Sequence, residues 1–374
     1  MTSFLVPDQL VFRKTTSPAR ADAEVRGWRS VSSHLAVPDC FGRTRQPDEH
    51  RIIYEDVFAS GRCHTLLGDL IGAADRDPQY IPRVEALIDD IFRDILRSVE
   101  HTGRIVRLSA CVPALYAERL RQGGRIDAWY RNPPITLKLP DGRGTVGVDE
   151  LATYTVIING HRATMDLPSV VADVRASLAP DSRWMTAVTQ GDPTEPNIAE
   201  PLCWLDFEHA GRNTVLGEAA NLLWYLLGLG GWLVPRYQPD VYARTLRRHF
   251  KPVAIPQLGH VSLRKEDRLL TVEYSWSVGP GRQAAISRTV HWLRGSLAPA
   301  AGLPTRVLLH GLRPFLTLRI LGVIPARQLS SGDLLLLLAK IAELALPEMT
   351  LENFVSTVPG NRPDERSTDD CHAA

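Results

Sequence analysis

The stretch TQGDPTEPNIAEPLCWLDFEHAG, Thr189 to Gly211, poses the central question about this chain of 374 residues. It begins as a polar turn, and an apolar run from Leu202 to Leu205 then precedes an acidic pair. Four of its polar side chains fall within seventeen residues: Asp192, Asn197, Asp206 and Glu208. If the two halves pair as neighbouring strands of a β-hairpin, these groups lie close together. The spacing therefore predicts a hairpin that gathers oxygen ligands in one place.

Such ligands suit one kind of chemistry. Carboxylate and amide oxygens bind Mg²⁺ well, and phosphoryl transfer needs Mg²⁺ beside a carboxylate that orients and deprotonates the accepting hydroxyl. In a hairpin, Asn197 and Asp206 can face one metal ion, while Asp192 stays on the loop and can reach a substrate. The stretch thus carries the groups that phosphoryl transfer requires.

The composition is that of an ordinary globular protein. Hydrophobic residues make up 44% and charged residues 23% of the chain, and the length suits one large domain or two smaller ones. The net charge of +1 gives no overall field that attracts nucleic acid or an anionic membrane. We therefore expect a cytoplasmic protein whose partner is a small molecule, with no nucleic acid and no membrane. The sequence leaves the oligomeric state open.

Neither a targeting segment nor a membrane span is expected. The N-terminal MTSFLVPDQLVFRK lacks a long apolar core behind a basic start. The longest apolar runs, Leu222 to Val234 and Leu334 to Leu346, are too short or too charged to cross a bilayer. The cysteines form no CxxC pair, which predicts reduced thiols. They are Cys40, Cys63, Cys111, Cys203 and Cys371.

Hydrophobic periodicity divides the rest of the chain into elements. The clearest is an amphipathic helix from about Pro82 to Glu100, whose apolar positions follow a spacing near 3.6 residues. Asp-Gly and Asn-Gly pairs at 141–142 and 159–160 predict two hairpin turns. Residues 4–14 are expected to form one strand or a short hairpin, and further strands are expected at 50–58 and within 261–277. Helices are expected at 21–33, 65–71, 167–178, 217–229, 283–297 and 333–346. From Gly360 the chain has no periodicity, which predicts a disordered tail.

The combined pattern of GDPTEPN followed by LDFE resembles the catalytic and metal loops of the aminoglycoside phosphotransferase and choline kinase group, relatives of protein kinases. Those proteins carry HGDxxxxN and then D-F-E or D-W-E. GEAANLLWYLL, which comes next, is similar to the helix that follows in the group. The resemblance covers about residues 5–72, 82–100 and 167–230. It is much more specific than a lone Gly-Asp pair.

The resemblance implies an α+β fold with the two lobes of a protein kinase. The N-terminal lobe, residues 1–58, is reduced and ends at the hinge. The C-terminal lobe, residues 59–359, is mainly helical, carries inserted strands and holds the catalytic and metal loops. Residues 360–374 are the expected disordered tail.

The resemblance also implies roles for single residues. Asp192 corresponds to the catalytic base, and Asn197 and Asp206 to the Mg²⁺ ligands. Gln190 stands where the group usually has histidine, a residue that shapes the loop. Glu218 either hydrogen-bonds the catalytic loop from below or is a helix-start acid favoured by the dipole.

Glu208 has three open interpretations: a supporting acid, a substrate contact or an ordinary surface acid.

In the N-terminal part, LVFRKTTSPARADAEVRGW resembles the strand lysine and helix glutamate of a small lobe. Lys14 then contacts the phosphates of ATP, and Glu24 pairs with Lys14; the alternative is two exposed charges. RIIYEDV leads to the hinge, where the backbone from Glu55 to Val57 is available to the adenine ring.

One departure concerns the phosphate loop. Thirteen residues precede Lys14, and they contain no glycine. We expect that they do not form a glycine-rich loop, so that either the loop is missing or the natural chain starts further upstream. Without the loop, ATP binding is expected to be weak, with Lys14 and a metal on Asp206 supplying most of the phosphate contacts.

The sequence thus predicts a small-molecule kinase that uses ATP and Mg²⁺. It would transfer the γ-phosphoryl group to a hydroxyl of a sugar, aminocyclitol, nucleoside or amino alcohol. Residues 103–166 and the C-terminal helices are expected to shape the acceptor site, and the charge of the acceptor stays open. The alternative is a non-catalytic kinase-like protein that binds a nucleotide or metabolite. Hydrolase and dinucleotide-binding interpretations lack their motifs.

Overall fold

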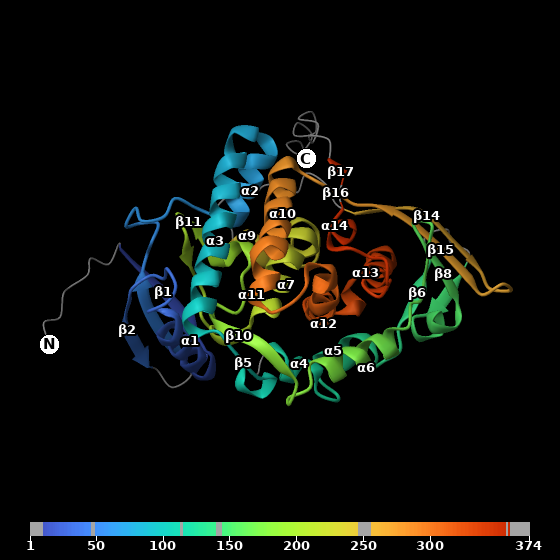
Figure 1. Cartoon of the computed structure of the whole chain (residues 1–374), viewed down its shortest axis with the longest axis horizontal. Coiled ribbons are helices and arrows are strands. Elements are labelled where there is room, and N and C mark those ends of the chain that lie inside the picture. The colour runs from blue at the N-terminus through green and yellow to red at the C-terminus, as the bar shows by residue number, and fades with distance from the viewer. Residues whose placement is uncertain are drawn as a thin grey trace, which may run out of the picture.

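The computed structural model describes residues 10–45, 49–112, 115–139, 144–245, 256–356 and 358–359, and all that follows concerns these residues. They form a mixed α/β structure with several small sheets. An N-terminal sheet lies at one end, long helices occupy the middle, and a second group of strands lies at the opposite end (Figure 1). The expected turn at 141–142 and the expected tail lie outside the described residues.

The N-terminal sheet packs against one helix. Its three strands are antiparallel in the order β1-β3-β2, which places the strand of Lys14 directly beside the strand that ends at Glu55. The helix α1 follows β1 after one residue and buries Ala21, Glu24 and Val31. The bounds are β1 Val11–Thr16, α1 Pro18–Val31, β2 Cys40–Arg45 and β3 His50–Glu55. The strand β2 is an addition to the sequence prediction.

The long helices in the middle bury their apolar faces against one another. The amphipathic helix α3 follows its predicted pattern, with Val84, Ile88 and Ile91 fully buried. It packs against α10 and α2 (Figure 1). The main helices are α2 Leu67–Arg76, α3 Ile81–Thr102, α6 Leu167–Ser177, α7 Val215–Trp224, α10 Pro280–Trp292, α12 Leu308–Leu321 and α13 Ser331–Glu343.

The helix predicted at 217–229 continues beyond its expected end. After α7 the chain forms a wider π-helical segment, Tyr225–Leu233, which runs into α8, Val234–Tyr237. A Cβ at Gly230 would collide with the carboxylate of Glu195, which pairs with the buried Arg282. The glycine therefore allows an ion pair to approach the helix backbone.

Two small sheets position the loops of the opening stretch. One has the order β13-β10-β5 and the other β12-β11-β4, all antiparallel. The strand β10 ends immediately before Gln190. The bounds are β4 Thr65–Leu66, β5 Arg104–Arg107, β10 Arg183–Thr189, β11 Ile198–Glu200, β12 Cys203–Trp204 and β13 Gly211–Thr214.

The opposite end of the molecule contains a four-stranded sheet, β14-β15-β8-β9, and the hairpin β6-β7 (Figure 1). The predicted turn at 159–160 joins β8 to β9. The bounds are β6 Thr136–Lys138, β7 Thr145–Gly147, β8 Thr155–Ile158, β9 His161–Ala163, β14 Gln257–Arg264 and β15 Leu269–Ser275. Shorter elements are α4 Ala117–Leu120, α5 Arg125–Tyr130, α9 Pro239–Thr245, α11 Ala298–Ala300, α14 Leu351–Phe354, β16 Ser277–Val278 and β17 Val358–Pro359.

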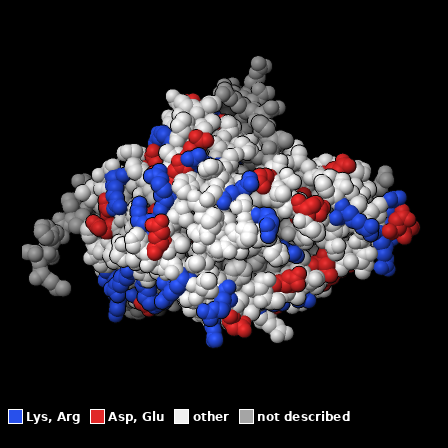
Figure 2. Space-filling view, in the orientation of Figure 1, with Lys and Arg blue, Asp and Glu red and all other residues white. Residues whose placement is uncertain are grey.

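The surface has no dominant charge on the face that Figure 2 shows. Basic and acidic side chains are interspersed over most of it, which fits the net charge of +1. Among the described helices, none has the length and apolar character that crossing a bilayer requires.

Candidate active site

The predicted hairpin is present in the stretch from Thr189 to Gly211. Its strands pair with Ile198 opposite Trp204, and Leu205 N donates to Asn197 O at 2.8 Å. Asn197 therefore precedes the first strand, and Asp206 follows the second at the same end of the hairpin. The backbone of Asp206 has a φ of 58°, a left-handed conformation that few residues other than glycine adopt.

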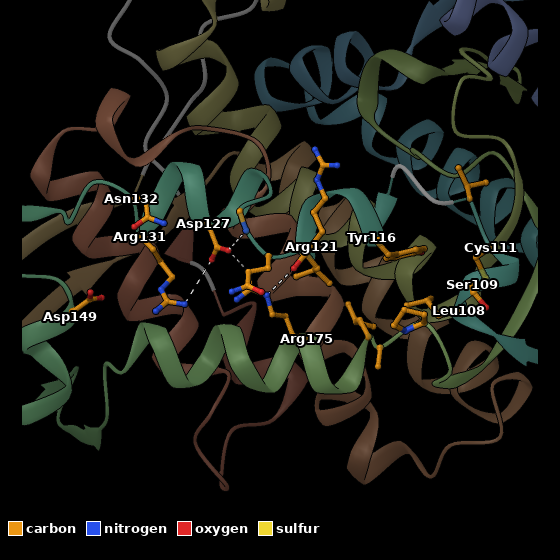
Figure 3. A pocket seen from close by; sticks show the side chains of 18 of the residues that line it. Leu108, Ser109, Cys111, Tyr116, Arg121, Asp127, Arg131, Asn132, Asp149 and Arg175 are labelled. Atoms are coloured by element: carbon orange, nitrogen blue, oxygen red, sulfur yellow. Dashed lines mark hydrogen bonds and ion pairs between the residues drawn. The ribbon is translucent and has the colours of Figure 1, made fainter.

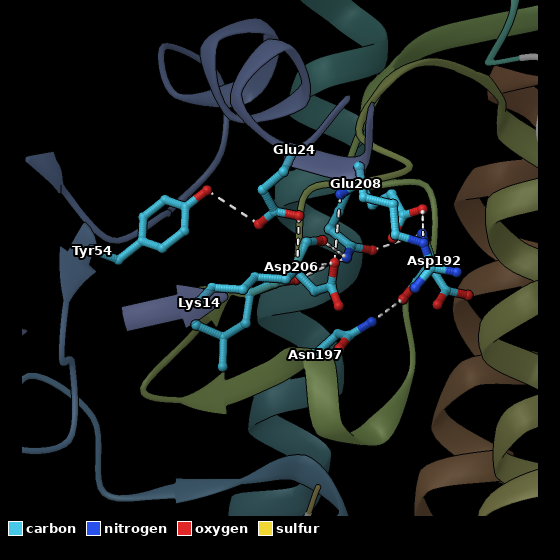
Figure 4. A network of polar contacts seen from close by, with 10 residues as sticks. Lys14, Glu24, Tyr54, Asp192, Asn197, Asp206 and Glu208 are labelled. Carbon is cyan, nitrogen blue, oxygen red and sulfur yellow. Dashed lines mark hydrogen bonds and ion pairs between the residues drawn. The ribbon is translucent and has the colours of Figure 1, made fainter. Parts of the chain in front are cut away.

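Lys14 and Asp206, 192 positions apart, are in direct contact. Lys14 Nζ lies 2.8 Å from Asp206 Oδ1 and 2.7 Å from Glu24 Oε2 (Figure 4). Glu24 is 1% exposed, and Tyr54 donates to its other oxygen at 3.1 Å. The alternative of two exposed charges is wrong for Lys14 and Glu24, because Glu24 is buried and Lys14 pairs with both Glu24 and Asp206.

The electrostatics of this cluster favour a protonated lysine. Burial lowers the pKa of Lys14, but the nearby carboxylates of Asp206 and Glu24 outweigh burial and raise the pKa above its usual 10.5. Burial raises the pKa of Glu24, and Lys14 offsets only part of that effect. The cluster thus keeps a fixed positive charge beside the exposed carboxylate of Asp206.

Gln190 connects the loop of Asp192 to the loop of Asp206. Its side-chain oxygen accepts from Asp192 N at 2.7 Å. Its Nε2 donates to the carbonyls of Leu205 at 2.8 Å and Asp206 at 2.6 Å. An amide can accept and donate at once, so glutamine ties the two loops together by itself. This is the loop-shaping role expected at the position.

The carboxylate of Asp192 is held by two helices. Asn221 of α7 donates to Asp192 Oδ1 at 2.8 Å, and Arg319 of α12 lies 2.9 Å from the same oxygen. Asn197 donates to the backbone carbonyl of Asp192 at 3.0 Å. Burial raises the pKa of Asp192, but Arg319 and Asn221 outweigh burial and leave the pKa below its usual 3.8. The side chain is 26% exposed, so an ionised carboxylate reaches the surface of the site.

Glu218 supports the same loop from inside the protein. One of its oxygens accepts from Gly191 N at 3.0 Å, and the other accepts from Thr189 Oγ1 at 2.9 Å. The side chain is 2% exposed. Burial raises the pKa of Glu218 to about 7, although these hydrogen bonds oppose the shift. Of the two interpretations of this acid, the hydrogen bond to the loop of Asp192 is therefore present.

Glu208 lies at the rim of the site. Its backbone N–H points to Asp206 Oδ1 at 3.5 Å, and its carboxylate lies 3.5 Å from Arg20 Nε. Arg20 is exposed. The described contacts make Glu208 a partner of a surface arginine.

At the expected hinge, one backbone N–H has no hydrogen-bond partner among the described residues. Glu55 N donates to Asp39 O, and Val57 O accepts from Cys63 N at 2.7 Å. The carboxylate of Glu55 pairs with Arg62 at 2.9 Å. Within the described residues the N–H of Val57 has no hydrogen-bond partner. At the expected hinge the Val57 N–H is therefore unpaired among the described residues, while the residue itself is 2% exposed.

The oxygens of Asn197 and Asp206 suit a hard cation. Asn197 uses its Nδ2 on Asp192 O, so its Oδ1 is left for another ligand. Asp206 accepts hydrogen bonds through Oδ1, which leaves Oδ2. Figure 4 draws the two side chains next to each other, and an amide with a carboxylate fits Mg²⁺. No group of three or more His, Cys, Asp and Glu side chains that could hold a metal occurs among the described residues.

A large cavity lies outside this network. It has a volume of about 1120 Å³ and is bounded by α4, α5 and α6 (Figure 3). Within it Asp127 accepts from Arg175 at 2.7 Å and from Gly123 N at 2.8 Å. None of the residues predicted for catalysis, metal or nucleotide lines this cavity. Tyr116 lines both this cavity and a smaller one beside Asp192.

Sequence reasoning missed Arg319 and Asn221. Asn221 lies within the helix that supported the resemblance, but its contact with Asp192 spans 29 positions and leaves no local pattern. Arg319 lies in a helix of apolar residues, LLHGLRPFLTLRIL. A charged residue amid such a run is rarely buried without a partner, and that signal could have identified it.

Comparisons with known proteins find a distant similarity. No family model matches the chain, and no curated protein matches its sequence. Among solved structures, a glucosamine kinase in crystal form B is similar at 13% identity and a TM-score of 0.44, over 92% of this chain and 74% of that one. Crystal form A is similar at 13% identity and a TM-score of 0.40, over 91% and 72%. The activity of this chain has to be argued from its own site.

Proposed function

We propose that this chain is a small-molecule kinase that transfers the γ-phosphoryl group of ATP to a hydroxyl of its acceptor. One observation carries the proposal: Lys14 Nζ contacts Asp206 Oδ1 at 2.8 Å while Glu24 holds it at 2.7 Å. Segments far apart in the chain thus assemble a fixed cation beside a candidate metal-binding carboxylate. Phosphoryl transfer from a nucleoside triphosphate needs a cation and a metal-binding carboxylate held close together, because its catalysis is mainly positioning and charge stabilisation.

Each residue has a distinct part in the proposed reaction. Asp192 accepts a hydrogen bond from the acceptor hydroxyl and takes its proton as the oxygen bonds to the γ-phosphorus. The bond from that phosphorus to the β-γ bridging oxygen breaks, and ADP leaves. Lys14 contacts the phosphates, and Glu24 keeps Lys14 in place. Mg²⁺ held by Asn197 and Asp206 would neutralise phosphate charge. The Val57 N–H is free to hydrogen-bond the adenine ring.

The proposal includes a two-lobed organisation. Residues 1–58 would form the reduced lobe that ends at the hinge, and residues 59–359 the larger lobe. The site lies where the N-terminal sheet meets the loop of Asp206 (Figure 4). We place the protein in the cytoplasm, with ATP and a small hydroxyl compound as its ligands.

Replacement of the proposed base tests the activity. We expect Asp192→Asn to lower turnover at least about 100-fold, because general-base catalysis contributes 10²–10⁴-fold. The measurement is ADP release, coupled to an optical assay, across a panel of hydroxyl metabolites. Asp181→Asn, an exposed aspartate on the preceding turn, is the control and should leave the rate unchanged. Turnover of Asp192→Asn within a few-fold of the parent would show that Asp192 is not the base.

Alanine variants separate the base from the metal ligand. Asp192→Ala and Asp206→Ala should each remove nearly all turnover, and the two losses should not add, because the groups act in one step. Only Asp206→Ala should also weaken binding of Mg²⁺-ATP, measured by calorimetry. Equal weakening in both variants would contradict the assigned roles.

A non-catalytic nucleotide-binding protein is the second candidate. It is favoured by the contact of Lys14 with Asp206 Oδ1, which leaves only one oxygen of this carboxylate for a metal. Binding of ATP without ADP release for any acceptor in the panel would support this candidate. ADP release that depends on both an acceptor and Asp192 would exclude it.

A further inference from the structure

The side of Asp192 that faces away from Lys14 is strongly basic. In Figure 4 Asp192 lies at the end of the polar network opposite Tyr54. Arg319 reaches it there from α12, at 2.9 Å. Burial, followed by repulsion from the nearby Arg319, lowers the pKa of Arg119 of α4 and of Arg125 of α5. Arg119 and Arg319 also line the same small cavity, so two helices bring two guanidinium groups close to Asp192.

Arg119 has no partner within the described residues. It makes neither a hydrogen bond nor an ion pair there, and its Nε is buried. Burial, followed by repulsion from Arg319, lowers the pKa of Arg119 to about 10. Arg319 also leaves a buried Nε unpaired. Arg119 as a whole is partly buried, and a charge withdrawn from water without a partner is costly, so its place beside Asp192 calls for a function.

The neighbouring acids do not balance these cations. Asp192 acts on Arg119 and Arg319, and Glu118 acts on Arg125. Arg125 is otherwise engaged, with NH1 donating to Gly322 O at 3.2 Å and its guanidinium over the Trp129 ring. The described surroundings thus hold one arginine, Arg119, in excess of the carboxylates that could pair with it.

His209 adds no charge of its own to this region. Burial lowers its pKa, and attraction by Asp192 does not restore it. The imidazole is therefore mainly neutral at pH 7, and its buried Nδ1 has no partner among the described residues.

A small cavity adjoins the unpaired groups. It has a volume of about 30 Å³, roughly the share of liquid volume of one water molecule. Its lining includes Arg119, Arg319, Asn221 and Gly191. The cavity is therefore large enough for part of one charged group, with the rest of a ligand outside it.

We propose that the acceptor is anionic: a hydroxyl compound with a carboxylate or phosphate group that Arg119 and Arg319 bind while its hydroxyl faces Asp192. This rests on the proposed kinase function and names the class of its acceptor. A cationic amino sugar or amino alcohol would meet the same arginines with like charge. Arginine forks bind both carboxylates and phosphates through paired N–H bonds, so the experiment separates the two.

Anion binding tests the proposal without any turnover. The probes are inorganic phosphate and acetate, each titrated by calorimetry in the absence of nucleotide. The variants are Arg119→Met, Lys14→Met and, as a matched control, Arg107→Met at an exposed arginine of β5. We expect Arg119→Met to weaken binding of at least one probe about tenfold to a hundredfold, the range for a charged hydrogen bond. Arg107→Met should have no effect.

Lys14→Met separates the two places where phosphate could bind. Anion binding that survives Lys14→Met and is lost in Arg119→Met supports the proposal. If only phosphate binds, the acceptor carries a phosphate group. If acetate binds as well, the acceptor carries a carboxylate. The proposal would be overturned if only Lys14→Met removed anion binding. It would also be overturned if neither probe bound at concentrations of tens of millimolar.

Stability supplies a second readout that does not depend on the probe. Without anion, Arg119→Met should raise the midpoint of thermal unfolding, because it removes an unpaired, partly buried charge. A lowered midpoint would show that Arg119 is a structural group and would overturn the proposal. Failure of the kinase function would show separately, as absence of ADP release while anion binding at Arg119 persists.

Discussion

Glu218 shows how one buried carboxyl couples the catalytic loop to pH. Its folded pKa of about 7 exceeds the usual 4.5, so the folded state binds more protons than the unfolded state between these values. The contribution of Glu218 to the free energy of unfolding should therefore be largest below about pH 4.5 and fall by about 3 kcal/mol as the pH rises to 7. Denaturant titrations between about pH 4.5 and pH 7 measure this change in the free energy of unfolding.

The isosteric variant Glu218→Gln isolates this effect. It cannot ionise, and its amide can still bond Gly191 and Thr189, so this part of the pH dependence should disappear. Glu100→Gln, at an exposed position at the end of α3, should keep it. An unchanged pH profile in Glu218→Gln would mean that Glu218 titrates like an exposed acid.

At the scale of elements, the helix after the metal loop depends on glycine for a packing reason. A Cβ at Gly230 would collide with Glu195, which is buried with Arg282. Gly230→Ala should lower the free energy of unfolding by about 1–3 kcal/mol, the usual cost of overpacking. Gly295→Ala is the matched control in another π-helical segment, where a Cβ meets nothing within 4 Å. That variant should be neutral or slightly stabilising. Similar losses in both would refute the packing explanation.

At the scale of the whole molecule, Lys14 joins the N-terminal sheet to the body of the protein. Lys14→Met would leave Glu24 buried without its cation, which typically costs about 3–5 kcal/mol. Adding Glu24→Gln should restore most of that stability, since no buried charge is then left alone. A double-mutant cycle by chemical denaturation gives the coupling between the two side chains. Independent, additive losses would mean that the ion pair contributes little to docking the sheet.

Much of the site could be predicted because its signals are local. The turn before Asn197 and the apolar run before Asp206 predict the hairpin, and the periodicity of 82–100 predicts α3. The strand β2 escaped prediction because CFGRTR has no clear alternation of buried and exposed residues. The alternative of two exposed charges could be decided only from the tertiary structure, in which Lys14 contacts both Glu24 and Asp206.

The sequence by itself determined the hairpin, the order of lysine, glutamate, asparagine and aspartate, and the apolar faces of the long helices, since residue type and spacing fix these within one element. Only the tertiary structure decided what surrounds Asp192. Arg319 reaches it across 127 positions, and Arg119 arrives from a four-residue helix. Apolar residues at helical spacing show that one face of a helix is buried. Which of its residues face a distant loop depends on the packing of the whole chain.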